Sequence, residues 1–492
     1  MRRPVGFFPP GFRVPKGSGI FMETKAKKWL SLFLILTLSV TMLFGATGFA
    51  QGASYSKAKT IFENCGDYIY NTVKEPVVGT YGGEWVMYGF GHAGYDISDE
   101  YRNAYLANVE KELKETEGIL HKKNFTEYSR VIIGLTAIGA DASDFAGYDL
   151  TEALADFVNV KWLGQNSVMW ALIALDSGDY KMPELTESYR YGTLTPKETN
   201  RTNSRQRMVN YLLANQYADG GWNILTKNEK KTGYNAVSSV DMTAMGMVAL
   251  APYRNQPKVK KALDRAIAYL SKKQNKNGGY KFYGTENSES CAQAICGLIA
   301  CGVNPNTDSR FVKNGKSIVD ALLTFYDEKT GGFRHVNKAS GGFKPVVDQM
   351  ATEQAYYALA FFYQYVPGKT TLAAVTKPAG GQLEVTWKKA EINTDYVTKQ
   401  SGETAAVSGY QIVCATDKKF TKGVKKVTVS ASTLAKTSGD VLTDGTLTDG
   451  SLTKTVTGLK KGKTYYVKVR AYKTVNGKKI YGLYSSVQSC KA

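Results

Sequence analysis

The sequence is poor in the residues that build metal centres and covalent cross-links. Its 492 residues include three histidines and six cysteines, and the cysteines show no paired spacing. This pattern excludes a disulfide framework, and so few histidines disfavour a zinc site with the usual ligands. Cys291, Cys296 and Cys301 follow one another at steps of five residues, which turns them onto different faces of a helix. We therefore expect them to be small buried side chains, and we predict neither a metal site nor a cofactor.

Long apolar runs are also absent beyond residue 50, so no later segment is expected to span a membrane. The one long run starts at Trp29, after three lysines, and ends in small residues before Gln51. This order is typical of a secretory signal peptide, which we assign to residues 1–50, with translation starting at Met22. The run approaches the length of a membrane span, so an uncleaved anchor is the alternative. The pattern predicts a secreted or cell-surface protein.

A Gly-Gly-aromatic segment, in contrast, occurs three times at nearly even spacing. It reads NQYADGGWNI at 215–224, KQNKNGGYKF at 273–282 and YDEKTGGFRH at 326–335. Repetition on this scale indicates a repeat architecture. Glycine in the left-handed conformation lets the chain leave a helix. We expect the aromatic residues that follow to pack between neighbouring helix pairs and not to bind a ligand; they are Trp222, Tyr280 and Phe333.

Helical segments of two kinds alternate between residues 51 and 366. One kind is apolar nearly all round and is found at 83–94, 127–139, 166–178, 239–251, 288–302 and 350–362. The other is amphipathic, with apolar residues at steps of three and four, and is found at 56–73, 97–115, 149–159, 203–216, 258–274 and 314–328. The first kind needs neighbours on every side, and the second needs one covered face. Together they predict an all-α (α/α)6 toroid with the apolar helices inside.

The pattern Gln-x3-Gly-Gly-aromatic, at Gln216–Trp222 and Gln274–Tyr280, resembles the prenyltransferase and squalene-oxidase repeat. That repeat is found in squalene and oxidosqualene cyclases and in protein prenyltransferase β subunits, and transcobalamin-like proteins and complement thioester domains share the toroid. The resemblance covers about residues 55–366 and implies a terpenoid-cyclase-like fold. It does not imply one activity, because enzymes and binding proteins share this fold.

Each chemistry known in that family requires residues that this chain has only in part. The cyclase acid motif D-x-D-D-T-A is reduced to SVDMTA, which keeps only Asp241, although the catalytic acid depends on its acidic neighbours. A prenyltransferase zinc site would have Glu289 and Cys291 but no histidine on the last helix. The thioester motif GCGEQ is matched only around Glu353, without its cysteine. We therefore favour a binding or adhesion protein.

Polar residues recur at the amino-terminal turns of the apolar helices. Asp and Glu at such positions commonly cap helices and offset their dipoles. Alternatively, they surround one mouth of a central cavity, which with nearby aromatic residues would suit a glycan, a peptide or a cationic small molecule. The candidates are Trp85, Tyr88, Glu127, Tyr128, Arg130, Trp170, Asp241, Glu289 and Glu353. As a second hypothesis, Asp241 and Glu289 form the acid and base of an extracellular terpene-cyclase-like enzyme, glycosidase or lyase.

The amino-acid composition of the chain changes at Pro367. Residues 367–492 alternate apolar and polar positions between turns such as Asn476-Gly477, which predicts an all-β domain. Trp387, Tyr410 and the segment 459–465, which is similar to a tyrosine corner, resemble a fibronectin type III domain. Most of the net charge of +20 lies here, because residues 51–367 hold 35 basic and 34 acidic residues.

The basic residues of this domain either form a solvated sheet face or bind an anionic cell-wall polymer. Export, and lysines that are not interleaved with aromatic residues in the sequence, argue against nucleic acid. We therefore expect a secreted Gram-positive surface protein in which a basic module spaces or attaches a ligand-binding toroid. A cobalamin-type carrier is disfavoured, because the fibronectin-like segment takes the place of the small β domain of such carriers.

Overall fold

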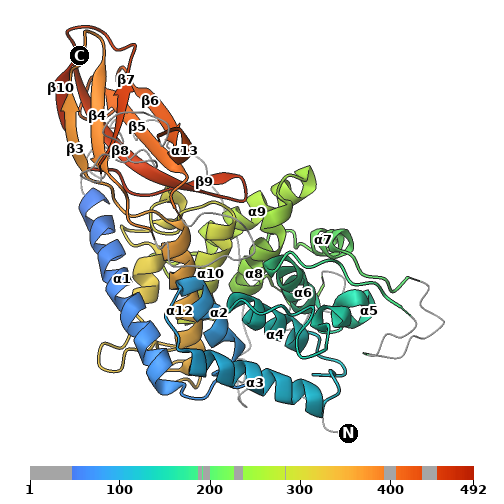
Figure 1. Ribbon diagram of the computed structural model, residues 1–492. Helices are drawn as coiled ribbons and strands as arrows, with labels where there is room; N and C mark the ends of the chain where they lie inside the picture. Colours follow the sequence, from blue (N-terminus) through green and yellow to red (C-terminus); the bar gives the residue numbers. More distant parts are fainter. Residues whose placement is uncertain are drawn as a thin grey trace, which may run out of the picture.

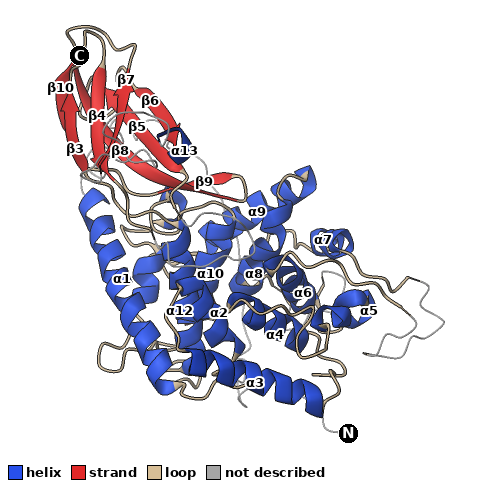
Figure 2. Ribbon diagram, in the orientation of Figure 1, coloured by secondary structure: helices blue, strands red, loops and turns tan. Residues whose placement is uncertain are grey.

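The computed structural model describes residues 47–186, 191, 200–226, 237–282, 284–392, 406–434 and 451–492. Helices form the first part of the chain and β-strands the second (Figures 1 and 2). The exceptions are a short hairpin of β1 (Lys281–Phe282) and β2 (Thr285–Glu286) and the four-residue helix α13 (Ala431–Leu434). The predicted signal peptide lies outside the described residues, apart from 47–50. Within the described part, no helix has the length and apolarity of a membrane span.

Six helices form the inner layer of the first part. They are α2 (Glu84–Ala93), α4 (Thr126–Ala137), α6 (Gln165–Ser177), α8 (Val240–Leu250), α10 (Ser288–Ala300) and α12 (Gln349–Tyr365). Each packs against the next, and α12 packs against α2, which closes a ring. The alternation of helices in the sequence therefore predicts the helical toroid correctly.

Glycine lets these helices come close together. A Cβ atom at Gly91 of α2 would lie 2.1 Å from the carbonyl oxygen of Ala137 on α4. A Cβ atom at Gly297 of α10 would lie 2.9 Å from Cα of Ala244 on α8. Both distances are too short for any larger residue, so the backbones meet almost directly at these points.

The outer layer contains the amphipathic helices. These are α1 (Thr47–Thr72), α3 (Asp99–Glu115), α7 (Arg205–Ala214), α9 (Pro257–Lys273) and α11 (Ile318–Leu323). The prediction of one continuous helix over 149–159 is wrong. The chain instead forms a 3-10 helix at Leu150–Ala155 and the short helix α5 at Phe157–Val160. Asp156 separates the two because it adopts extended backbone angles, caps α5 through the Val158 amide and pairs with Arg201.

The Gly-Gly-aromatic segments join outer helices to inner ones. The first glycine of each segment has a positive φ, +95° at Gly220 and +88° at Gly278. The side chain of Gln274 donates to the carbonyl oxygens of Gly278 and Phe311, both at 2.9 Å, and so ties the turn to the next outer segment. The aromatic residues of the three segments are fully buried, which confirms their predicted packing role.

The second part of the chain contains two antiparallel sheets that share one apolar core. One sheet has the order β3-β4-β7 and the other β10-β8-β5-β6, with β9 paired to β8. The strands are β3 (Leu372–Thr376), β4 (Leu383–Lys388), β5 (Gly409–Ala415), β6 (Lys425–Ser430), β7 (Ser451–Val456), β8 (Thr464–Val475), β9 (Lys478–Tyr481) and β10 (Gln488–Lys491). The core includes the predicted residues Trp387, Tyr410 and Tyr465.

The two adjacent glycines of the second repeat, Gly278 and Gly279, test whether the turn depends on the positive φ of its first glycine. Gly278→Ala places a side chain at positive φ, with Cβ 2.3 Å from the Ser317 carbonyl oxygen. We expect this substitution to destabilise the fold by about 2 kcal/mol or more. Gly279→Ala is the matched control, because its Cβ meets nothing closer than 3.5 Å. Thermal and urea unfolding of both variants would measure the difference, and equal stability would contradict this role of Gly278.

Candidate functional site

The helical ring encloses a cavity of about 400 Å³, within the usual range for small-molecule sites. All six inner helices contribute to its wall, from about the middle of each helix to its carboxyl end. The wall is mainly aromatic and aliphatic, with Tyr88, Ile133, Trp170, Ile173, Met245, Val248, Ile299, Tyr357, Phe361 and Tyr365. The cavity is therefore an apolar chamber near the carboxyl ends of the inner helices.

A hairpin of the second part completes the wall. Strands β8 and β9 are joined by Asn476 and Gly477, both at positive φ, which is the two-residue turn that Asn-Gly favours. Figure 1 shows this hairpin reaching from the sheets over the helical ring. Val475 and Asn476 line the cavity, and the Asn476 amide donates to the Ala300 carbonyl oxygen at 2.9 Å. Ile480 is buried with the residues of the helical core.

The ionisable groups of the cavity wall are neutral or paired. Burial lowers the pKa of His92 to about 4, so that its imidazole is uncharged at neutral pH. Burial raises the pKa of Asp176, while Arg205 at 2.7 Å and the Tyr253 hydroxyl at 2.8 Å oppose that shift and compensate its charge. Among the described residues, the wall thus presents no uncompensated charge to a ligand.

Three of the predicted aromatic and polar candidates lie in or directly beneath this chamber. Tyr88 and Trp170 line it. Trp85 lies about one turn nearer the amino end of α2, with its ring centroid 4.9 Å from Trp170 and 6.0 Å from Tyr357. These rings form one aromatic group at the inner end of the cavity.

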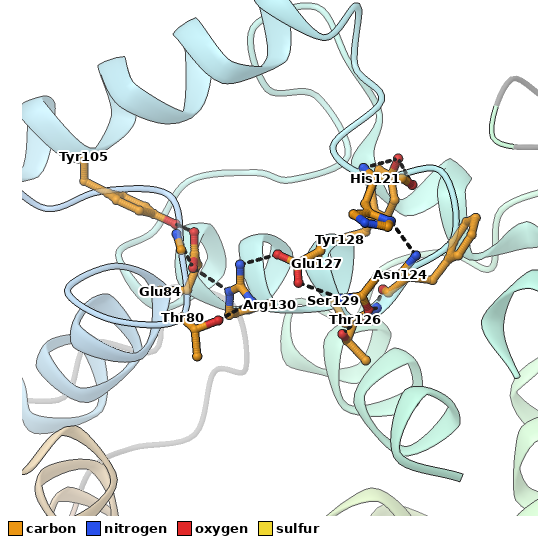
Figure 3. A network of polar contacts seen from close by, with 12 residues as sticks. Thr80, Glu84, Tyr105, His121, Asn124, Thr126, Glu127, Tyr128, Ser129 and Arg130 are labelled. Carbon is orange, nitrogen blue, oxygen red and sulfur yellow. Dashed lines mark hydrogen bonds and ion pairs between the residues drawn. The ribbon is translucent and has the colours of Figure 1, made fainter. Parts of the chain in front are cut away.

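The candidates Glu127 and Arg130 belong instead to a buried network that joins helices (Figure 3). The Arg130 guanidinium donates to Glu84 at 2.7 Å and to Thr80 at 3.2 Å, and it also pairs with Glu127. Burial raises the pKa of Glu84, and Arg130 opposes this shift. Neither Glu127 nor Arg130 lines the cavity, so the alternative that they surround its mouth is corrected: their ion pairs join helices.

Tyr128 also lies away from the cavity. Its ring is fully buried in a separate cluster with Phe125 and Tyr191. Its hydroxyl donates to the His121 carbonyl oxygen at 3.1 Å, as Figure 3 shows. This bond directs the Tyr128 side chain toward the loop before α4 and away from the centre of the helical ring.

Asp241 and Glu289 lie at the amino ends of α8 and α10, one turn before residues that line the cavity. His335 Nδ1 is 2.7 and 2.9 Å from the two carboxylate oxygens of Glu289. Although burial lowers the pKa of His335, Glu289 raises it above its ordinary value. Oδ1 of Asp241 is buried and has no hydrogen-bond partner among the described residues. Burial raises the pKa of Asp241 to about 6.

Glu353 lines a different hollow, of about 580 Å³, formed by residues of α1, the segment after it and α12. Its carboxylate accepts from the Gly82 amide at 2.8 Å and from Gln349 at 3.0 Å. Burial raises the pKa of Glu353 to about 7. Glu353 therefore lies apart from the central chamber.

Sequence reasoning missed the contribution of α12 to the cavity. Tyr357, Phe361 and Tyr365 follow one another at steps of four, so they share one face of the helix, and this spacing is visible in the sequence. The contribution of Asn476 could not be found this way. The sequence indicates its turn, but nothing near it indicates contact with a helix almost 180 residues earlier in the chain.

No protein-family model matches the sequence, and no curated protein matches it. Several solved structures share the helical part at low identity. One is the type II terpene cyclase MstE from Scytonema, with 12% identity over 62% of this chain and 97% of that chain, and a TM-score of 0.37. Another is the unsaturated glucuronyl hydrolase from Bacillus sp. GL1, with 13% identity over 62% and 96% and a TM-score of 0.41. Likenesses at this level assign no activity.

The raised pKa of Asp241 predicts a pH-dependent gain in stability for Asp241→Asn. Below about pH 4 the carboxyl is protonated in both the folded and the unfolded chain, so the substitution has little effect. As pH rises through about 6, the folded protein must ionise a buried group. Stability falls over this range, by about 2 kcal/mol after allowance for the partial exposure of the residue. The variant avoids this loss at pH 7–8.

Urea unfolding at pH 4 and pH 7.5 would measure the effect. Asp308→Asn provides a control with the opposite sign, because hydrogen bonds from Arg310 lower the pKa of Asp308 despite its burial. Its substitution should reduce stability at pH 7.5. A loss of stability in Asp241→Asn at pH 7.5 would show that the Asp241 carboxylate is favourably bound.

Proposed function

We propose that this chain is an exported binding protein that holds a small, largely apolar molecule inside its helical ring. The observation that carries the proposal is the chamber of about 400 Å³ lined by all six inner helices. Pockets for small molecules are typically apolar and aromatic, with few polar groups that set orientation. A glycan or peptide is less well suited, because it brings many polar groups that would need partners on burial.

A few polar groups remain to orient such a ligand. The amide nitrogen of Gln293 donates to Gln354 at 2.9 Å and to the Tyr357 hydroxyl. Its amide oxygen has no partner among the described residues and could accept from a ligand hydroxyl. The aromatic side chains of Tyr88, Trp170 and Tyr357 also line the chamber and provide apolar contact. The arrangement favours a rigid or aromatic molecule with one polar end.

The second part of the chain supports attachment and closure. We infer that it is a fibronectin type III domain, because its two sheets have the orders β3-β4-β7 and β10-β8-β5-β6. The Tyr465 hydroxyl also accepts from the Lys460 amide at 3.1 Å, the bond that defines a tyrosine corner. In this proposal the domain holds an anionic wall polymer on its basic surface, and its β8–β9 hairpin covers the ligand.

Binding of an apolar probe tests the chamber. Titration with N-phenyl-1-naphthylamine should give saturable fluorescence enhancement and quench tryptophan emission, because Trp170 lies in the wall. Val248→Trp fills the chamber with a larger side chain and should weaken binding about tenfold or more, equivalent to about 1.4 kcal/mol.

Val487→Trp is the matched control, because Val487 is 47% exposed and lies in the second part of the chain. It should bind the probe like the unsubstituted protein. Absence of saturable binding up to millimolar probe, or full binding by Val248→Trp, would refute the proposed chamber.

Asp241 favours a second function, that of an extracellular enzyme using Asp241 as general acid. Its carboxyl has a pKa of about 6 and an unpartnered buried oxygen, and the pair of Glu289 and His335 is nearby. A carboxyl that is partly protonated at neutral pH can donate a proton to an alkene or to a glycosidic oxygen.

Product formation from isoprenoid and glycoside substrates would test this function. Asp241→Asn should abolish turnover but retain binding of the apolar probe, because Asn keeps the shape of the side chain and loses only the acidic proton. Unchanged turnover in the variant, or none in the unsubstituted protein, would exclude Asp241 as a catalytic acid.

A further inference from the structure

The outer face of the sheet β10-β8-β5-β6 carries cations on β8 and on β6, the two strands that flank β5. Side chains alternate between the two faces of a strand, and Val467, Val469 and Ala471 of β8 point into the core. Lys468 and Arg470 therefore lie on the outer face. Lys468 and Lys426 pair with Val413 of β5 from opposite sides, which places both lysines in one row.

Aromatic rings from other segments lie between these cations. Nζ of Lys468 is 3.9 Å from the ring centroid of Phe420 and 4.2 Å from that of Tyr484. Cζ of Arg470 is 4.4 Å from Tyr484 and 3.8 Å from Tyr481. The sequence suggested lysines without interleaved aromatic residues, but folding brings these rings between them. The result is an ordered ladder of Phe420, Lys468, Tyr484, Arg470 and Tyr481.

The ladder holds its cations in place but does not neutralise them. Cation–π contact fixes position without supplying a counter-charge. Arg470 donates through Nε and one terminal nitrogen to the amide oxygen of Gln411, at 3.1 and 2.8 Å. In the described part of the chain, no carboxylate pairs with Lys468 or Arg470, and Lys468 has no hydrogen-bond acceptor. Burial, together with repulsion from Arg470 and Lys426, lowers the pKa of Lys468.

From this arrangement we propose that the outer face, with Lys426, Lys468 and Arg470 as its centre, binds a linear phosphate-bearing polymer. The idea rests on the attachment role proposed above and identifies the site and the chemistry of its partner. Alternate residues of a strand, such as Lys468 and Arg470, are about 6.8 Å apart, and two strands on either side of a third, such as β8 and β6, are about 9.6 Å apart. Fixed cations at these spacings can contact successive phosphates of an extended chain, and Arg and Lys are the usual phosphate donors.

The aromatic rings favour a polymer without bases. Proteins that bind single-stranded nucleic acid leave aromatic faces open for bases to stack on. Here the faces of Phe420, Tyr484 and Tyr481 are turned toward the cations of the ladder. The face therefore provides positive charge and little room for stacking, which suits a polyol phosphate or inorganic polyphosphate.

Binding of the full chain to fluorescently labelled inorganic polyphosphate at low salt tests the proposal. Lys468→Gln combined with Arg470→Gln should weaken binding about tenfold or more, because it removes the fixed cations at the centre of the face. Lys454→Gln combined with Lys461→Gln removes the same charge from β7 and the following turn and should change affinity less than about threefold. Lys418 also belongs to this face, because its Nζ is 5.9 Å from the ring centroid of Tyr466 on β8. If the first variant unfolds, Lys418→Gln combined with Lys426→Gln, both at exposed positions, should still weaken binding.

Three results would overturn the proposal. They are absence of polyphosphate binding, equal losses in the two charge-matched double variants, and tighter binding of single-stranded DNA than of polyphosphate of the same charge. The apolar probe should bind all variants equally, because the chamber is formed elsewhere. Failure of the phosphate site would thus be distinguishable from failure of the chamber.

Discussion

The close approach of the inner helices is the constraint on which the rest of the structure depends. Glycine at positions such as Gly91 and Gly297 brings neighbouring backbones into direct contact, and interiors tolerate few voids between packed elements. Six helices packed side by side in a ring nevertheless leave space along their common axis. Aromatic side chains of α2, α6 and α12 fill the inner end of that space, and the chamber is what remains toward the carboxyl ends.

The two ends of the ring differ in chemistry. At the amino ends, two carboxylates are held by specific partners, Glu84 by Arg130 and Glu289 by His335, whereas Oδ1 of Asp241 has no hydrogen-bond partner among the described residues. Such pairs fix neighbouring helices because a buried charge without a partner is costly. At the carboxyl ends the wall is apolar, and its few ionisable groups are neutral or compensated. The helical ring thus has polar, ion-paired groups at one end and an apolar cavity at the other.

Periodicity predicts most of the fold, because a helix buried on all sides and a helix buried on one side leave different patterns in the sequence. It also finds the helices that carry the chamber, and Tyr88 and Trp170 within them. It does not show the depth at which each side chain lies, so it left open whether Glu127 and Arg130 line a mouth, and it did not show that they form an ion network with Glu84. The partner of Arg130 is 46 residues away, at Glu84. The break at Asp156 likewise depends on a distant arginine, Arg201.

The β8–β9 hairpin has a consequence for how this chain can be divided. A boundary drawn after residue 366, where the composition changes, separates the helical ring from two residues of its own chamber wall, Val475 and Asn476. It would also uncover the apolar surface that now packs against Ile480. A truncated helical ring would thus have a wider entrance and exposed apolar side chains around it. The separated sheets would keep a hairpin that lacks the helices it now contacts. The two parts of the chain share one cavity wall, which neither part alone would complete.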